Sequence, residues 1–179
     1  MKIQSLAVFC GSKTGNDRSF VNDANTLGQL LARENIELIY GGGNKGIMGT
    51  VANAVLENNG RVTGIIPKAL TKWEHQHEGI SELIVVETMH IRKHMLYERS
   101  DAAVVLPGGF GTMDELFEIL TWNQLKIHDK QIFILNTAGF YDHLIAHIRH
   151  MQKENFLYNE ALDKIVFLNA VEELIPYFK

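Results

Sequence analysis

The chain carries the stretch LPGGFGTMDE at residues 106–115, and its surroundings indicate a strand, a turn and a helix in that order. An apolar run precedes it at residues 102–106, and Leu116, Ile119 and Leu120 follow it at the spacing of one helix face. A glycine-rich turn that opens a helix directs backbone N–H groups and the positive end of the helix dipole at one point. The stretch therefore predicts an anion site at the end of a strand.

Glu115 adds a carboxylate beside this expected anion site, one turn inside the helix. A carboxylate next to a phosphate cradle indicates chemistry on a nucleotide or a sugar phosphate. The spacing of Thr112 and Glu115 also matches a capping box, in which each side chain satisfies the other's backbone N–H. The proline and paired glycines before Thr112 favour a binding site, because capping alone does not need a backbone that a ligand can approach closely.

Strand and helix patterns alternate along the whole chain. Apolar runs that lack a polar face predict strands covered on both sides, as in a parallel sheet. We expect one domain over residues 1–179 with an α/β, Rossmann-like, doubly wound fold in three layers. The expected strands are residues 6–10, 36–40, 62–66, 83–86, 102–106 and 131–136. The expected helices are residues 20–34, 46–58, 89–100 and 140–153, together with the segment after the motif. Residues 165–168 and 171–177 finish the chain.

Three of the expected strands end in glycine-rich turns, at residues 10–12, 40–43 and 106–109. The carboxyl ends of parallel strands share one edge of a sheet, and ligands of doubly wound folds bind there. We therefore expect all three turns at one site. The polar stretch at residues 68–82 is the one long loop expected, and loops of this length are often lids over a site.

Composition narrows the function. The chain has 179 residues, 46% of them hydrophobic and 21% charged, as in ordinary globular proteins. A net charge of −4 and a pI near 6.0 argue against a nucleic-acid binder. The single cysteine, Cys10, excludes an internal disulfide, and no run approaches the ~18 apolar residues of a membrane span. We expect a cytoplasmic protein that binds neither nucleic acid nor membrane.

Two further motifs bear on the ligand. Residues 41–46, GGGNKG, have the glycine spacing of a dinucleotide-binding site. They follow the second strand, however, and no acidic residue ends the next strand, so the spacing is a weak signal for such a site. The sequence also contains no P-loop. Arg92 and Lys93 stand near the start of an expected helix, where the dipole disfavours cations unless an anion lies opposite. The alternative for this pair is a solvated basic face. The histidines show no spacing that indicates a metal site.

Together these motifs resemble those of the Lonely Guy-type cytokinin riboside 5'-monophosphate phosphoribohydrolases, often mislabelled as lysine decarboxylases. The matching stretches are GGGNKGIMG at residues 41–49, MHIRK at residues 89–93 and PGGFGTMDE at residues 107–115. The resemblance covers nearly the whole chain. It implies a Rossmann-like homodimer, without metal or cofactor, that hydrolyses a nucleoside 5'-monophosphate to the free base and ribose 5-phosphate.

The resemblance also implies the site residues. Arg92 and Glu115 would be the catalytic pair, and residues 109–112 would hold the 5'-phosphate. The positions implied to contact substrate are Ser12, Gly43, Glu74, Met89, Lys93, Gly108, Gly109, Phe110, Gly111, Thr112 and Thr121. The loose match around Glu74 leaves the choice of base open.

The expected chemistry suits these residue types. Glycosidic cleavage passes through an oxocarbenium-like transition state, which a carboxylate such as Glu115 stabilises. Arg92 stays charged and is expected to position and stabilise rather than donate a proton. The alternative is a nucleotide or molybdenum-cofactor carrier without catalysis. Lysine decarboxylation would need a lysine that binds pyridoxal phosphate, and no lysine stands in an evident context for it.

The helix after the motif also bears on assembly. It has apolar residues on more than one face, Leu116, Phe117, Leu120, Trp122 and Leu125 among them. Such a helix can bury one side against a partner copy or can be buried within the fold. With the resemblance, this pattern leads us to expect a homodimer.

Overall fold

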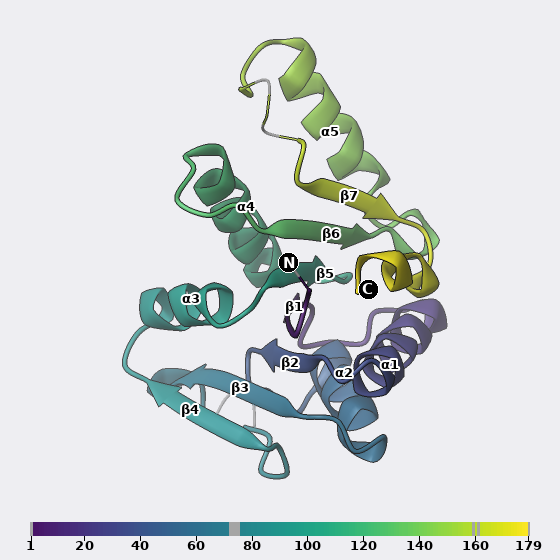
Figure 1. The fold of residues 1–179 in the computed structure, drawn as a ribbon, viewed down its shortest axis with the longest axis vertical. Coiled ribbons are helices and arrows are strands. Elements are labelled where there is room, and N and C mark those ends of the chain that lie inside the picture. The colour runs from purple at the N-terminus through teal and green to yellow at the C-terminus, as the bar shows by residue number, and fades with distance from the viewer. Residues whose placement is uncertain (1, 72–75, 159, 161, 179) are drawn as a thin grey trace.

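The protein folds around one parallel sheet, seen in a computed structural model that describes residues 2–71, 76–158, 160 and 162–178. The strands pair in the order β4-β3-β2-β1-β5-β6-β7 (Figure 1). Their bounds are β1 (Ser5–Phe9), β2 (Glu37–Tyr40), β3 (Val62–Pro67), β4 (Glu82–Val86), β5 (Ala102–Val105), β6 (Gln131–Leu135) and β7 (Ile165–Leu168). The predicted doubly wound α/β fold is confirmed, and the strand order reverses at β1, between β2 and β5.

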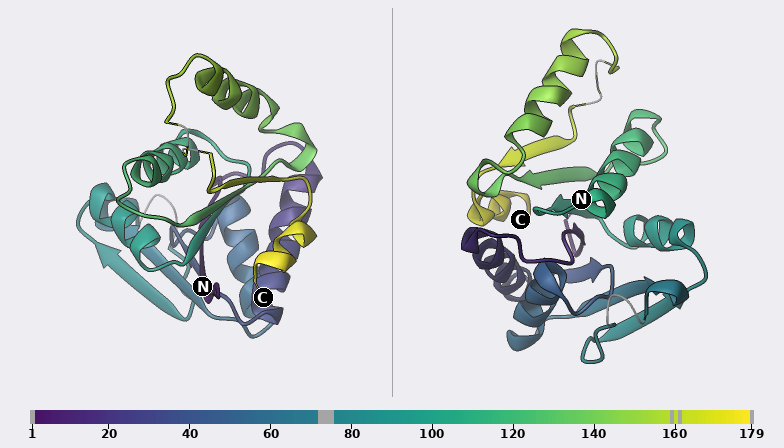
Figure 2. Two further views of the ribbon diagram at one scale, coloured as in Figure 1. Left: turned by 45° about the horizontal axis from the view of Figure 1, so that its top comes forward. Right: turned by 180° about the vertical axis from the view of Figure 1, so that it is seen from behind.

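Helices cover both faces of this sheet, as the apolar strands predicted (Figures 1 and 2). The helices are α1 (Arg18–Arg33), α2 (Gly46–Glu57), α3 (Met89–Glu98), α4 (Phe110–Gln124) and α5 (Asp142–Lys153), and the 3-10 segments are η1 (Lys68–Leu70), η2 (Thr137–Gly139) and η3 (Val171–Tyr177). One core cluster joins α1, α2 and η3 to alternate strand residues such as Leu6 and Val8. The other joins α3, α4 and the start of α5 to the residues between them, such as Ala7 and Phe9.

Helix ends differ from the sequence-based boundaries for local reasons. The helix expected from residue 140 begins at Asp142, after the η2 turn, in which Ala138 has a φ of 52°. The Asn136 side chain holds that turn, because it accepts from the Tyr141 N–H at 2.7 Å and donates to Asp142 at 2.8 Å. At the end of α2 the left-handed residue is Asn59, at φ 60°. Among the described residues, no helix is long and apolar enough to cross a membrane.

The described part of the expected loop at residues 68–82 is held against the sheet edge. Gln76 forms an antiparallel bridge with Gly43, and the His77 N–H donates to the Gly42 carbonyl at 2.9 Å. The His77 ring is buried, with Nε2 2.9 Å from Asn53 Oδ1, and its Nδ1 accepts from the Gly79 N–H at 3.1 Å. A neutral ring with its proton on Nε2 satisfies both contacts. His77 therefore ties this loop to the glycine turn after β2 and to α2.

We expect acid to lower the free energy of unfolding partly through His77, because burial lowers the pKa of its ring below the ordinary 6.5. Above that pH the ring is neutral in both states and its contribution is complete. As the pH falls below it, the unfolded chain takes up the proton first, so stability decreases until the folded ring also titrates. Replacing His77 by alanine should cost about 1–3 kcal/mol at neutral pH, because Asn53 and the Gly79 N–H lose their partner.

Denaturant unfolding near neutral pH and about one pH unit below 6.5 checks this expectation for the wild type, His77→Ala and His143→Ala. His143 is exposed on α5 and serves as the matched control. The His77 variant should lose less stability on acidification than the wild type. An equally steep loss in that variant would show that other groups carry the acid sensitivity.

Candidate functional site

The three glycine turns meet at the carboxyl edge of the sheet, as the sequence predicted. The Gly11 N–H donates to the Pro107 carbonyl at 3.1 Å, and a Cβ on Gly11 would lie 3.3 Å from the Gly108 Cα. Gly46, at φ 59°, brings the turn after β2 so close to the first turn that a Cβ there would lie 2.4 Å from the Lys13 nitrogen. The site therefore lies beside β1, where ligands bind in doubly wound sheets.

The start of α4 has no side-chain cap among the described residues. Its N-cap is Gly109. The capping-box interpretation of Thr112 and Glu115 is wrong, because Thr112 is the third residue inside the helix and is buried. A Cβ added to Gly109 or Gly111 would meet no described atom within 4 Å, so open space lies against this backbone. The N–H groups and dipole of the first turn can therefore face a bound phosphate.

A pocket of about 230 Å³ opens in front of this turn. It receives Arg92 from α3 and Glu115 from α4, so the two expected catalytic residues line one cavity. The other lining residues come from the ends of β1 and β2, from α2, from η1 and from the two helix starts: Val8, Cys10, Gly11, Ser12, Gly41, Met48, Leu70, Met89, Gly109, Phe110, Gly111 and Thr112. The pocket thus joins a permanent cation, a carboxylate and a helix N-terminus.

Arg92 reaches the pocket because the wall opposite it has no side chain. Its exposed fraction is 5%, and a Cβ on Gly41 would lie 2.0 Å from its Nη2. The Met89 sulfur lies 3.8 Å from Nη1, on the same helix. Thr88 caps α3 by accepting from the Ile91 N–H, which fixes the helix start three residues before Arg92. The guanidinium is therefore packed into one position.

Comparison with known proteins now agrees with this geometry. The profile of a family described as "Possible lysine decarboxylase" matches residues 48–178. The cytokinin riboside 5'-monophosphate phosphoribohydrolase LOG2 of Arabidopsis thaliana is 41% identical over 182 residues, which cover 98% of this chain and 85% of that protein. The cytokinin riboside 5'-monophosphate phosphoribohydrolase of Rhodococcoides fascians is 39% identical over 173 residues, covering 96% and 87%. The chain belongs to the LOG-type phosphoribohydrolase family.

Solved structures that resemble this LOG-family chain share its fold at low identity. The molybdenum cofactor binding protein of Rippkaea orientalis superposes with a TM-score of 0.73 at 21% identity, over 98% of this chain and 95% of that one. The molybdenum cofactor carrier protein of Chlamydomonas reinhardtii gives 0.71 at 19% identity, over 98% and 95%. Identities this low show the common fold and do not identify a ligand.

Not every residue that the family resemblance suggested lines the pocket. Gly108 lies in an adjoining hollow of about 380 Å³, which shares Gly11, Ser12 and Gly109 with it. Gly43 is buried at the bridge to Gln76. Thr121 donates to the Phe117 carbonyl at 2.7 Å and lines a groove between α4 and α5 instead. Glu74 lies outside the described residues.

Lys93 is also directed away from this LOG-family pocket. Its Nζ lies 3.1 Å from Asp114 Oδ2 and 3.2 Å from Glu118 Oε2, both on α4. Its side chain is only 10% exposed. Burial alone would lower the pKa of Lys93, but the two carboxylates outweigh that effect and raise it. Lys93 therefore keeps its positive charge between α3 and α4.

Some residues that line the pocket were not predicted as contacts. Met48 and Leu70 have no chemical signature in the sequence, and only the fold brings them to the site. Gly41 belongs to the glycine run at residues 41–43, but the sequence does not show that it is the one beside Arg92. The wall of a LOG-type site is thus harder to predict than its charged residues.

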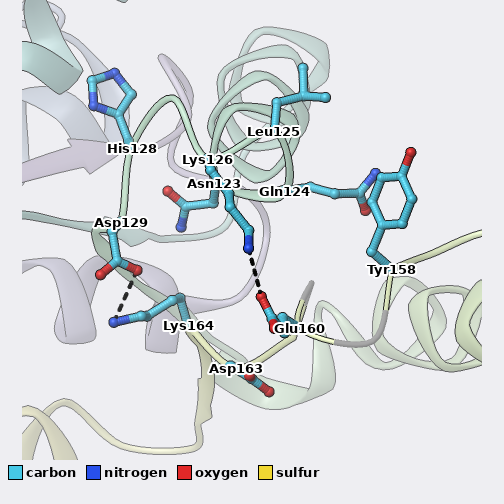
Figure 3. Close-up of a pocket in the computed structure, with 10 residues that line it drawn as sticks. All are labelled: Asn123, Gln124, Leu125, Lys126, His128, Asp129, Tyr158, Glu160, Asp163 and Lys164. Carbon is cyan, nitrogen blue, oxygen red and sulfur yellow. Dashed lines mark ion pairs between the residues drawn. The ribbon is translucent and has the colours of Figure 1, made fainter.

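A larger hollow lies elsewhere and is bordered by ion pairs. It measures about 750 Å³ and lies where β6 and β7 begin, at the edge opposite the glycine turns. Figure 3 shows the side chains that line it. Lys126 contacts Glu160 at 3.2 Å and Lys164 contacts Asp129 at 3.1 Å across it. Its described lining residues include the end of α4 but no helix start, so it lacks the anion-binding N–H groups of the smaller pocket.

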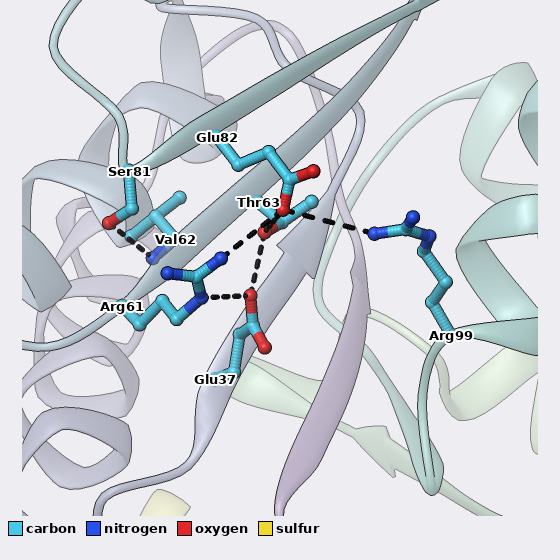
Figure 4. Close-up of polar contacts among 7 residues, drawn as sticks. All are labelled: Glu37, Arg61, Val62, Thr63, Ser81, Glu82 and Arg99. Atoms are coloured by element: carbon cyan, nitrogen blue, oxygen red, sulfur yellow. Dashed lines mark hydrogen bonds and ion pairs between the residues drawn. The ribbon is translucent and has the colours of Figure 1, made fainter.

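A second polar network occupies the same opposite edge. Arg61 contacts Glu37 at 2.9 Å and Glu82 at 3.2 Å, the Thr63 hydroxyl donates to Glu37 at 2.6 Å, and Arg99 approaches Glu82 at 3.9 Å (Figure 4). These residues join the starts of β2, β3 and β4. The charged groups of this network pair with one another and tie the three strands together. The carboxyl edge of the sheet is therefore the candidate active site of this family member.

Proposed function

We propose that this protein hydrolyses the N-glycosidic bond of a nucleoside 5'-monophosphate, AMP or an N6-modified AMP of the cytokinin type. The products are the free base and ribose 5-phosphate. The observation that carries the proposal is the convergence of Arg92, Glu115 and the start of α4 on one pocket. Relatives from Arabidopsis thaliana, at 41% identity, and from Rhodococcoides fascians, at 39% identity, are named for this reaction.

In the proposed mechanism the 5'-phosphate binds the N–H groups at the start of α4, with Arg92 close to it. Binding at the phosphate fixes the ribose and orients C1'. Glu115 stabilises the positive charge that develops at C1', and it also orients the attacking water. The bond from C1' to the base nitrogen breaks, the water oxygen bonds to C1', and a water proton ends on the departing base.

The base would lie at the mouth of the pocket. Phe110 is 97% exposed there and Met89 is 40% exposed, so both offer apolar surface that a planar base can cover. These side chains support a purine with an apolar N6 substituent. They do not exclude plain AMP, and the assay below compares the two.

Lysine decarboxylation, the activity for which the matching family is named, does not suit the pocket residues. Pyridoxal phosphate needs a lysine amine for its Schiff base. Among the described residues that line the pocket there is no lysine, and Lys93 is held between two carboxylates. We therefore derive no step that uses this cofactor.

A nucleotide panel tests the proposed function. AMP, GMP, CMP and N6-isopentenyl-AMP are incubated with the protein, and free base is measured by chromatography. We expect release of base from AMP or its N6-modified form, with weaker release from GMP and CMP. Binding of a nucleotide without release of base from any of the four would contradict the hydrolase and support a carrier.

We also propose a cytoplasmic homodimer with its interface on α3 and α4. Outside the pocket, these neighbouring helices leave apolar side chains uncovered: Ile91 and Phe117 have exposed fractions of 42% and 41%. Apolar side chains left exposed on neighbouring helices are candidates for a protein interface.

Light scattering tests the proposed dimer. It should give a mass of about 40 kDa, twice the 20.2 kDa of the chain. Ile91→Asp should shift that mass toward one chain, because a buried charge in an interface is costly. A mass of one chain for the wild type would contradict the dimer.

A further inference from the structure

We propose that Lys93 is a positioning residue that locks α3 to α4 and thereby holds Arg92 and Glu115 across the pocket. This inference rests on the proposed function, because it assigns Lys93 a part in the same reaction. It differs from a role in substrate binding, in which Lys93 would itself contact the phosphate. The contacts of Lys93 favour the lock over direct binding.

The first support is the pairing of neighbouring residues on the two helices. Arg92 and Lys93 are adjacent on α3, and Asp114 and Glu115 are adjacent on α4. Adjacent helical residues point about 100° apart. Arg92 and Glu115 line the pocket, while Lys93 and Asp114 meet at 3.1 Å outside it. Each helix thus presents one residue to the pocket and its sequence neighbour to the lock.

The second support is the charge arrangement at the lock. Asp114 and Glu118 are four residues apart on α4, so they share a helix face and repel each other. Lys93 lies within 3.2 Å of both and offsets that repulsion. The contact with Glu118 is the better shielded from solvent, because Lys93 is 10% and Glu118 23% exposed, whereas Asp114 is 58% exposed. Loss of the lysine would both release α3 and leave two like charges on α4.

The third support is the close packing of the Arg92 guanidinium, which leaves it little room to move. Its guanidinium is 5% exposed and lies against Gly41 so closely that a Cβ there would lie 2.0 Å from it. A shift of α3 would therefore move Arg92 relative to Glu115 and to the start of α4. Displacement of a catalytic group by about 1 Å can cost about 10²-fold in rate. The lock is thus placed where small movements affect turnover most.

The test compares Lys93→Met, Lys93→Arg, the double variant Asp114→Asn with Glu118→Gln, and the triple variant that adds Lys93→Met to that pair. Lys93→Met removes the charge and keeps the stem, and Lys93→Arg keeps the charge. The triple variant carries no net charge at the lock, so it controls for unpaired carboxylates. For each, kcat and KM for AMP are measured with the inhibition constant of ribose 5-phosphate and the unfolding midpoint.

A lock predicts that Lys93→Met lowers kcat about 10- to 100-fold while ribose 5-phosphate binds within about threefold of wild type. The double variant should lose a similar factor, although neither carboxylate lines the pocket. The triple variant should be no worse than the double, because the residues act as one unit. Lys93→Arg should restore most of the rate.

Three results would overturn the lock. Weaker binding of ribose 5-phosphate in Lys93→Met, with a fully active double variant, would mean that Lys93 contacts the phosphate. Losses that multiply in the triple variant would mean independent roles. A fully active Lys93→Met would mean no positioning role. If the wild type releases no base, the proposed function fails instead of the lock. Crystal structures of the wild type and Lys93→Met then test the lock by the position of Arg92. In the variant Arg92 should move away from Gly41, and an unmoved Arg92 would refute the lock.

Discussion

Replacement of Glu115 by glutamine is expected to lower kcat for AMP hydrolysis by about 10³-fold or more, with the Kd for AMP within a few-fold of wild type. The amide has nearly the same shape as the carboxylate but carries no charge. It therefore keeps the pocket intact and removes the group that stabilises positive charge at C1'. Initial rates of base release and equilibrium binding of AMP measure the two quantities separately.

Glu57→Gln is the matched control for this substitution. Glu57 is an exposed carboxylate at the end of α2, so its loss should leave both rate and affinity unchanged. If Glu115→Gln weakens AMP binding and lowers the rate by the same factor, Glu115 contributes to ground-state binding rather than to the transition state. Full activity in the Glu115 variant would remove it from the mechanism.

Alanine at Gly111 is expected to lower kcat/KM for AMP about 10- to 100-fold without destabilising the protein. A Cβ there meets no described atom within 4 Å, so the clash arises only with a ligand on the backbone of the first turn of α4. Alanine is also the better helix former, so the free energy of unfolding should stay the same or rise by about 0.5–1 kcal/mol. Kinetics with AMP and denaturant unfolding give both numbers.

Gly108→Ala, three residues earlier in the same glycine-rich turn, is the contrasting variant. A Cβ there would lie 2.1 Å from Thr112 Oγ1 and 2.9 Å from the Gly11 nitrogen. Overpacking of this kind typically costs about 1–3 kcal/mol of stability, so this variant should be destabilised even without ligand. If Gly111→Ala keeps full kcat/KM, the phosphate does not bind against the start of α4.

The sheet and the edge that carries the site were predictable from the sequence. Apolar runs without a polar face predicted buried parallel strands, and the turns at residues 10–12, 40–43 and 106–109 predicted one shared edge. This works because parallel strands have their carboxyl ends together whatever their order. The strand order, and so the position of the pocket beside β1, came only from the structure.

Side-chain direction was the part that the sequence could not supply. Lys93 follows Arg92 directly, so a motif cannot separate their roles, whereas a helix turns them to different sides. Thr112 and Glu115 have capping-box spacing, but the helix begins at Phe110 with Gly109 as its N-cap, so Thr112 already lies inside the first turn. His77 lies in a stretch without helical or strand periodicity, yet in the structure its ring is buried and makes two hydrogen bonds.

Hydrolysis in water enriched in ¹⁸O tests the central claim most directly, with AMP or N6-isopentenyl-AMP as substrate and mass spectrometry of both products. The account predicts free base without label and ribose 5-phosphate whose ¹⁸O content at C1 exceeds that acquired by authentic ribose 5-phosphate through exchange in the same time, because the water oxygen bonds to C1' as the glycosidic bond breaks. It also predicts that Glu115→Gln forms neither product at a comparable rate. Recovery of both nucleotides intact after incubation with the wild-type protein would contradict the account.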